Sequence, residues 1–221
     1  MAKKSTKRRQ KARQRKAAKR KKKKTGRVPL ASRFRSGRGL LRTSGSWPLY
    51  ECLLSQEWQK EHAITQILVA RRSPIGQIAT GTFLVDLGCL GVKNAFASLF
   101  NLRQEYEQKL RADVMASQSM IEADVNLVAK IIREAIAYAK DLGFKPDPDY
   151  RDAMLVLGDV DPDACDVPIP LGGKDGKPFF FAGPRDNVDQ IMAKLTRKLG
   201  PDGFHFFFPM SGDEELFLPD E

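Results

Sequence analysis

Hydrophobic residues are distributed unevenly along this chain. Between Met1 and Val28 the only apolar side chains are scattered alanines, whereas periodic apolar groups recur from about position 47 to position 208. Alternation of apolar and polar residues indicates strands, and a spacing of three to four residues indicates helices. The pattern therefore predicts a folded body over residues 47–209, preceded by a segment that cannot form a core.

Strand-like segments occur in two parts of the body. Gln66–Arg72 and Gln77–Asp86 are β-rich, and the turn Ser73–Gly76 between them predicts a hairpin with a four-residue loop. Near the end of the body, Phe179–Ala182 and Phe204–Phe208 are short aromatic runs that predict two further strands.

Helical periodicity marks five segments. Tyr50–Trp58 predicts a short helix, with a strand as the alternative, and a helix is expected from Ala95 to Leu110. A longer one is expected from Ile121 to Leu142, and shorter ones after the capping residues of segments 147–157 and 186–199. We expect an α+β fold: a small antiparallel sheet packed with several helices, preceded by a disordered basic arm.

Charge divides the chain into parts of opposite sign. Residues 1–45 contain 20 Lys and Arg and no Asp or Glu, so the remaining 18 basic residues face all 27 acidic ones. The arm therefore carries +20 and the rest −9. We predict three regions: a basic disordered arm and linker at 1–46, a globular domain at 47–209 and an acidic C-terminal tail at 210–221.

The arm is the strongest functional signal. Lysine and arginine bind nucleic-acid backbones by releasing counterions and need no fold to do so. RNA or the ribosome is favoured over DNA, and a membrane is not expected because no large apolar side chain accompanies the first 24 residues. A solubilising tail or a nuclear-import signal is the alternative. The predicted nucleic-acid-binding residues are Lys3, Lys4, Lys7, Arg8, Arg9, Lys11, Arg13, Arg15, Lys16, Lys19, Arg20, Lys21, Lys22, Lys23, Lys24, Arg27, Arg33, Arg35, Arg38 and Arg42.

Four sequence blocks resemble a family of uncharacterised bacterial proteins. They are TQILVARR, GTFLVDLGCLGVKNAF, AIAYAKDLGFKPDPDY and GKDGKPFFFAGPRD, and the resemblance extends from about Tyr50 to Gly200. The most specific pieces are Cys89–Lys93 and Gly173–Pro178. The resemblance implies a bacterial, cytoplasmic setting and provides no catalytic residues.

No motif for a metal or a phosphate is complete. The loop with Asp159, Asp161, Asp163 and Asp166 resembles a calcium loop, but Ala164 and Pro170 occupy the positions that need Gly and Glu, so a solvated acidic loop is favoured. Gly172–Gly176 lacks the spacing of a phosphate-binding loop. The three cysteines, Cys52, Cys89 and Cys165, are far apart and form no CxxC pair. No metal or cofactor is expected.

A few side chains could carry chemistry, but each also has a structural interpretation. Cys89 lies in a glycine-flanked turn and could use His205 as a base, although a buried structural thiol is favoured. Asp86 is expected either to pair with Lys93 or to act as an acid or base, with the structural role favoured. The triplets Phe179–Phe181 and Phe206–Phe208 could stack on bases, but core packing is favoured.

These observations predict a protein that associates with RNA or the ribosome through its arm. The acidic body would serve as a placement or interaction module, docked on a protein surface or projecting from the nucleic acid. The alternative is a hydrolase-type enzyme tethered to nucleic acid by the arm. An enzyme is not favoured, because no triad, metal cluster or carboxylate pair stands out and no catalytic residue is assigned. With neither a secretory signal nor a membrane span expected, the predicted location is the cytoplasm.

Overall fold

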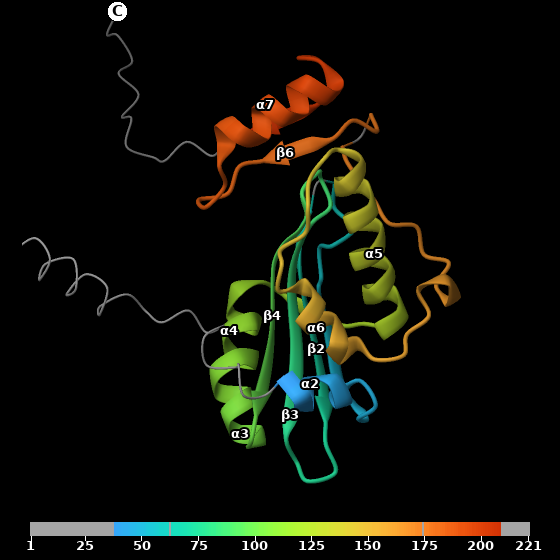
Figure 1. Ribbon diagram of the computed structural model, residues 1–221, viewed down its shortest axis with the longest axis vertical. Coiled ribbons are helices and arrows are strands. Elements are labelled where there is room, and N and C mark those ends of the chain that lie inside the picture. The colour runs from blue at the N-terminus through green and yellow to red at the C-terminus, as the bar shows by residue number, and fades with distance from the viewer. Residues whose placement is uncertain (1–37, 62, 174, 209–221) are drawn as a thin grey trace, which may run out of the picture. The chain divides into compact units, whose positions relative to one another are not determined.

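A computed structural model describes residues 38–61, 63–173 and 175–208, and the structure is reported for these residues. Its centre is a five-stranded antiparallel sheet with the order β4-β3-β2-β1-β5 (Figure 1). The expected α+β class is confirmed. The strands are β1 (Leu49–Ser55), β2 (Ile64–Arg72), β3 (Ile78–Asp86), β4 (Gly91–Phe100) and β5 (Met120–Glu122).

Helices cover both faces of this sheet (Figure 1). One face packs against α2 (Arg38–Ser44), α5 (Val125–Asp141) and α6 (Tyr150–Leu157). The other packs against one helical stretch composed of α3 (Arg103–Tyr106), a π-helical segment (Glu107–Arg111) and α4 (Ala112–Ser117). The central strands therefore bury side chains in two directions.

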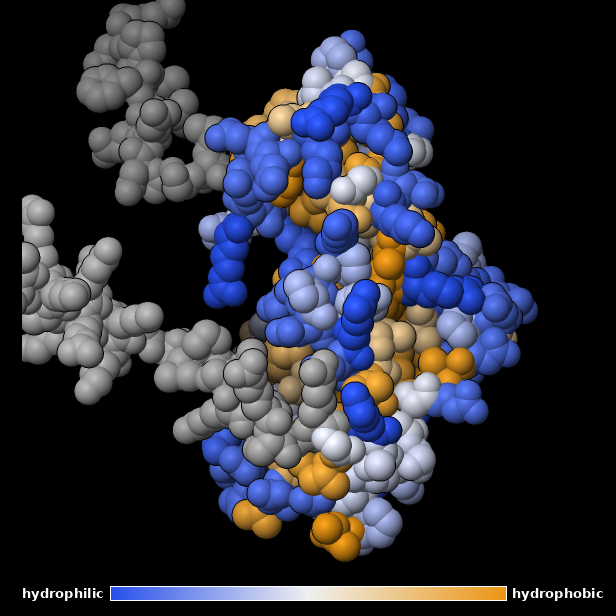
Figure 2. Space-filling model, viewed as in Figure 1, coloured by the Kyte–Doolittle hydropathy of each residue, from blue (hydrophilic) through white to orange (hydrophobic). Residues whose placement is uncertain are grey.

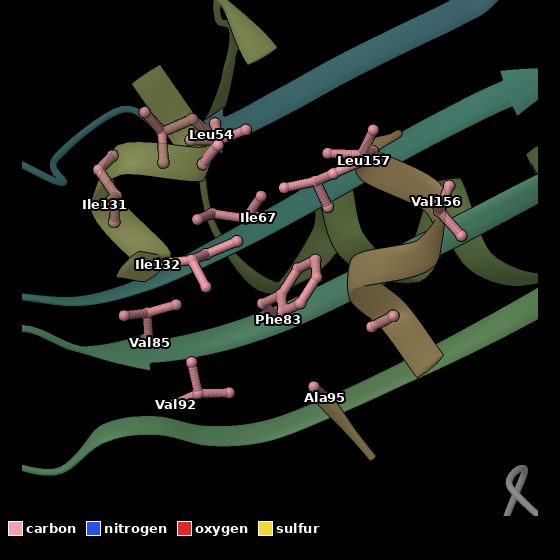
Figure 3. Close-up of a cluster of buried hydrophobic side chains, with 14 of the residues drawn as sticks. Leu54, Ile67, Phe83, Val85, Val92, Ala95, Ile131, Ile132, Val156 and Leu157 are labelled. Atoms are coloured by element: carbon pink, nitrogen blue, oxygen red, sulfur yellow. The ribbon is translucent and has the colours of Figure 1, made fainter. Parts of the chain in front are cut away.

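The core between the sheet and α5 and α6 is composed of aliphatic and aromatic side chains (Figure 3). Leu54, Ile67 and Phe83 project from three adjacent strands toward Ile132 of α5 and Leu157 of α6, and all five are fully buried. Burying such a side chain contributes about 1.5–3 kcal/mol. This layer therefore fixes how α5 and α6 sit on the sheet.

Arg71 joins two short helices to the sheet. Its guanidinium donates to the carbonyl oxygens of Val156 at 2.7 Å, Trp47 at 2.8 Å and Leu157. The carbonyls at a helix C-terminus lack partners within the helix, and a cation there is favourable. Arg71 thus provides hydrogen-bond donors for the last carbonyl groups of α6 and holds Trp47, which follows α2, against the sheet.

A second, smaller unit of structure follows the acidic loop, in which η3 (Pro162–Ala164) is a single 3-10 turn. It consists of β6 (Phe179–Phe181), α7 (Val188–Leu199) and β7 (His205–Phe207), with the two strands parallel. We call this βαβ segment the C-terminal unit. In Figure 1 it lies beyond one end of the five-stranded sheet. Its own core contains Phe180, Leu195 and Phe204.

Two predicted helices are not formed as expected, and for the first of them the alternative, a strand, is confirmed. Tyr50–Trp58 is mostly strand β1, and the first part of Ala95–Leu110 is strand β4, with helix only from Arg103 onward. Both strands are buried on their two faces, because Leu53 and Leu54 enter opposite cores. A strand with apolar residues on both faces loses its alternation, so its sequence resembles a helical stripe.

Several other predicted elements are confirmed with shifted ends. The hairpin of β2 and β3 is present, but its loop runs from Ser73 to Gln77 and is one residue longer than expected. The cap of α5 is Asp124 and that of α7 is Asn187 instead of Asp186. The segment predicted to be linker contains helix α2, whose Leu41 is buried, so folded structure begins before Trp47.

Ile132→Ala should lower the free energy of unfolding by about 2–5 kcal/mol, because it leaves a cavity at a fully buried position of α5. Urea unfolding followed by circular dichroism measures this. The control Lys140→Ala changes an exposed residue of the same helix and should stay within about 0.5 kcal/mol. Equal effects of the two substitutions would contradict the packing of α5 on the sheet.

Candidate functional site

The structure describes little of the predicted nucleic-acid interface. Of its twenty residues, Lys3 to Arg35 lie outside the described residues. Arg38 is the first residue of α2 and Arg42 lies near its end, where its side chain is exposed while Leu41 beside it is buried. Arg42 is therefore on the surface and accessible to a polyanion.

The predicted site around Asp86 is a tight turn between β3 and β4. Asp86 is 2% exposed, and Oδ1 of its carboxylate accepts a hydrogen bond from the backbone N–H of Cys89 at 2.9 Å, whereas Oδ2 has no hydrogen-bond partner among the described residues. Burial raises the pKa of Asp86 to about 6, although this hydrogen bond and the charge of Lys93 oppose the rise. Asp86 therefore holds the turn together.

Cys89 faces the interior of the C-terminal unit. It is fully buried and packs in one cluster with Phe180, Leu195 and Phe204. Burial raises the pKa of its thiol, and the carboxylates of Asp86 and Asp186 add to this effect. A neutral, buried thiol is a poor nucleophile, so the geometry agrees with a structural role.

Two glycines give this turn its shape for different reasons. Gly91 has φ of +68°, which side chains avoid, and a Cβ there would also contact Ala139. Gly88, on the other side of Cys89, is not among the glycines with positive φ. Gly88 is instead needed for close approach, because a Cβ would lie 2.3 Å from the carbonyl oxygen of Phe179.

The expected pair of Asp86 with Lys93 is replaced by a different ion pair. The ammonium of Lys93 lies 2.6 Å from a carboxylate oxygen of Asp186, and both side chains are largely buried. The same oxygen of Asp186 accepts the N–H of Gly183. This pair connects β4 to the loop between β6 and α7 and so ties the C-terminal unit to the main sheet.

The aromatic triplets divide between core and surface. Phe180 is fully buried, which confirms core packing there, but Phe206 and Phe207 are 50% exposed and Phe208 is 39% exposed, so core packing is wrong for these three. In the upper part of Figure 2, which α7 and β6 occupy in Figure 1, hydrophobic atoms are visible among hydrophilic ones. Strand β7 thus presents aromatic side chains to solvent.

His205 does not hydrogen-bond to Cys89 in the described structure. Its Nε2 lies 2.8 Å from Oδ2 of Asp175, and both side chains are about half exposed. The hydrogen bond from His205 lowers the pKa of the Asp175 carboxylate. His205 therefore belongs to a surface pair at the edge of the aromatic strands.

The acidic loop uses its carboxylates for local contacts. Asp161 accepts the backbone N–H of Asp163 at 3.1 Å, and Asp163 pairs with Arg133 at 2.7 Å. Within the described ranges, no three His, Cys, Asp or Glu side chains are placed to hold a metal ion. The expected solvated loop agrees with these contacts.

A cavity of about 520 Å³ lies beside the C-terminal unit. Phe181 of β6 forms part of its wall, and Ser55, Ile64 and Gln118 contribute from the main sheet and its connections. Gln118 is held there by donating to the carbonyl oxygen of Ile64 at 3.3 Å and by accepting from the hydroxyl of Ser55. The volume is within the range of small-molecule sites, about 300–1,000 Å³.

Comparison with family models, curated proteins and solved structures gives no match for this chain. The resemblance of the FLVDLGCLGVK and GKDGKPFFFAGP blocks to a bacterial family therefore stays a prediction. In the part of the chain that the structure covers, no helix has the length and apolar character needed to cross a membrane.

Native alkylation should distinguish the three cysteines. Burial raises the pKa of Cys52 to about 12 and also raises that of Cys89, whereas Cys165 is half-exposed. With iodoacetamide near neutral pH, mass spectrometry should find Cys165 modified first and the other two modified only after denaturation. Faster modification of Cys89 than of Cys165 would instead support a catalytic thiol.

The titration of Asp86 should be visible in the stability of the protein. Its pKa rises from 3.8 to about 6 on folding, so the folded state holds this proton more tightly. The contribution of this proton to the free energy of unfolding is complete below about pH 4 and is lost as pH rises through about 6. The total loss is up to about 3 kcal/mol.

The matched variant is Asp86→Asn, which keeps an oxygen that can accept the N–H of Cys89 and does not titrate. The wild-type free energy of unfolding should fall relative to that of the variant between about pH 4 and 6, as measured by denaturant titration at each pH. Parallel curves would show that Asp86 keeps an ordinary pKa.

Proposed function

We propose that this protein associates with nucleic acid, RNA or the ribosome in particular, through its basic N-terminal arm. The separation of charge carries the proposal: 20 Lys and Arg with no Asp or Glu in residues 1–45, against 18 basic and 27 acidic residues in the remainder. A segment of this composition attracts phosphate backbones through counterion release. The cytoplasm is the proposed compartment.

The folded body supports a role in placement. Its net charge is negative, so it repels phosphate and leaves the arm as the part that contacts the polyanion. Its acidic loop has partly exposed carboxylates, including Asp163. We infer that the body docks on a protein surface or projects from the nucleic acid to which the arm is bound.

The alternative function is a hydrolase-type enzyme tethered by the arm. Two side chains that could have carried its chemistry, Cys89 and Asp86, are buried and hold the turn between β3 and β4. The third, His205, is paired with Asp175 on the surface. These contacts favour the non-enzymatic proposal.

Removal of residues 1–37 should nearly abolish binding to RNA while the body stays folded, because every described helix and strand, from α2 onward, is retained. If about ten arm charges contact phosphate, log K for the full chain should fall against log salt with a slope near −7 on single strands. Fluorescence anisotropy with labelled RNA at several salt concentrations measures both quantities.

Two controls separate charge from sequence. An arm with its Lys and Arg changed to Gln should bind as weakly as the truncated chain, and an arm of shuffled order should bind as well as the native one. A truncated chain that binds RNA as tightly as the full chain would overturn the proposal.

A further inference from the structure

The two strands of the C-terminal unit have different faces. They run parallel with Phe180 opposite Phe206, so the side chains on either side of these positions point the other way. Phe180 is buried in the core formed with α7. The opposite face carries four aromatic rings, which we call the aromatic face: Phe179, Phe181, His205 and Phe207.

The four rings are arranged as two cross-strand pairs. Phe181 and Phe207 are stacked, with ring centroids 5.3 Å apart and an interplanar angle of 27°. Phe179 and His205 form the second pair at 6.4 Å. Such pairs hold the rings in fixed orientations on the sheet. The entropy cost of ordering the rings when a flat ligand binds would therefore be small.

Part of the aromatic face is open to solvent. Phe207 is 50% exposed, and the cavity of about 520 Å³ adjoins its partner Phe181. Single exposed phenylalanines are ordinary on protein surfaces. A stacked pair with one ring half exposed, beside a cavity, is different, because it leaves π surface accessible and provides space for a planar group.

Charge separates this unit from the rest of the body. Residues 172–208 contain six Lys and Arg against four Asp and Glu, whereas residues 46–171 contain 12 against 18. Two of those four carboxylates are already paired, Asp186 with Lys93 and Asp175 with His205. The aromatic face therefore belongs to the least acidic part of the body, and the charged residues that line the adjoining cavity are Glu57, Lys60 and Glu61.

We propose that the aromatic face of β6 and β7 stacks on the bases of single-stranded RNA, with Phe207 and Phe181 as the principal contacts. Aromatic side chains on a sheet combined with nearby basic residues are the general means of binding single strands. Stacking tolerates any base sequence, because each base has a π surface. This inference rests on the proposed function and assigns to the body the contact with bases and to the arm the contact with phosphates.

The test compares two substitutions on the same strand of the full-length chain. Phe207→Leu removes a ring from the aromatic face, and Phe206→Leu removes an equally exposed ring from the opposite face. Affinity for a labelled single-stranded oligonucleotide should fall about 5- to 150-fold for Phe207→Leu and little for Phe206→Leu, whereas Phe207→Tyr should retain it. The salt slope should not change, because the phosphate contacts remain.

A second readout reports stacking itself. A 2-aminopurine base in the oligonucleotide should change its fluorescence on binding to wild type and much less with Phe207→Leu, and affinity for duplex RNA should be the same for both proteins.

If wild type binds no RNA, both proposals fail. If wild type binds single-stranded RNA and Phe207→Leu binds it equally well, only this inference is overturned. The same holds if Phe207→Leu loses as much affinity for duplex RNA as for single-stranded RNA. Loss of self-association in Phe207→Leu with unchanged RNA binding would assign the face to a second copy of the chain and also overturn it.

Discussion

The hydrogen bond from the N–H of Cys89 to the buried Asp86 carboxylate shapes the turn at which two parts of the structure meet. This turn ends β3, and its backbone also pairs with the C-terminal unit: Phe179 donates to the carbonyl of Gly88 and Gly172 donates to that of Leu87. Without the carboxylate, the N–H of Cys89 would lack its partner, at a cost of about 1–3 kcal/mol. This turn and the Lys93–Asp186 pair together hold β6 at the end of the main sheet.

The same turn explains why a buried acid and a buried thiol lie next to each other without forming a reactive pair. Asp86 is oriented toward the backbone N–H of Cys89, and the Cys89 side chain points into the core with Phe180 and Leu195. The Asp86 carboxylate raises the cost of ionising the Cys89 thiol, since a thiolate beside a carboxylate is unfavourable. An arrangement suited to nucleophilic catalysis would need a cation or an imidazole beside the thiol. Lys93 is instead paired with Asp186.

Local signals allowed part of this fold to be predicted from the sequence. The hairpin of β2 and β3 has a strong turn, and α5 combines a regular apolar stripe with Gly143 at its end. The sequence predicts strand β1 only as an alternative to a helix, and it predicts a helix for the first part of β4, because burial on both faces removes alternation. The Lys93–Asp186 pair joins residues 93 positions apart, and nothing local specifies it. Likewise, the triplets of phenylalanine gave no means of telling the buried Phe180 from the exposed Phe207.

The exposed rings and the charged arm would make contributions of different physical kinds to the proposed RNA binding. Binding through the arm would be electrostatic, so it would weaken steeply with salt and would not distinguish single strands from duplexes by their bases. Stacking on Phe207 would add a contribution that depends weakly on salt and needs unpaired bases. Because the C-terminal unit has a net positive composition and the rest of the body is acidic, the phosphates that flank a stacked base would be repelled least at the C-terminal unit. A chain that uses both would keep a preference for single strands at salt concentrations where the arm alone binds weakly.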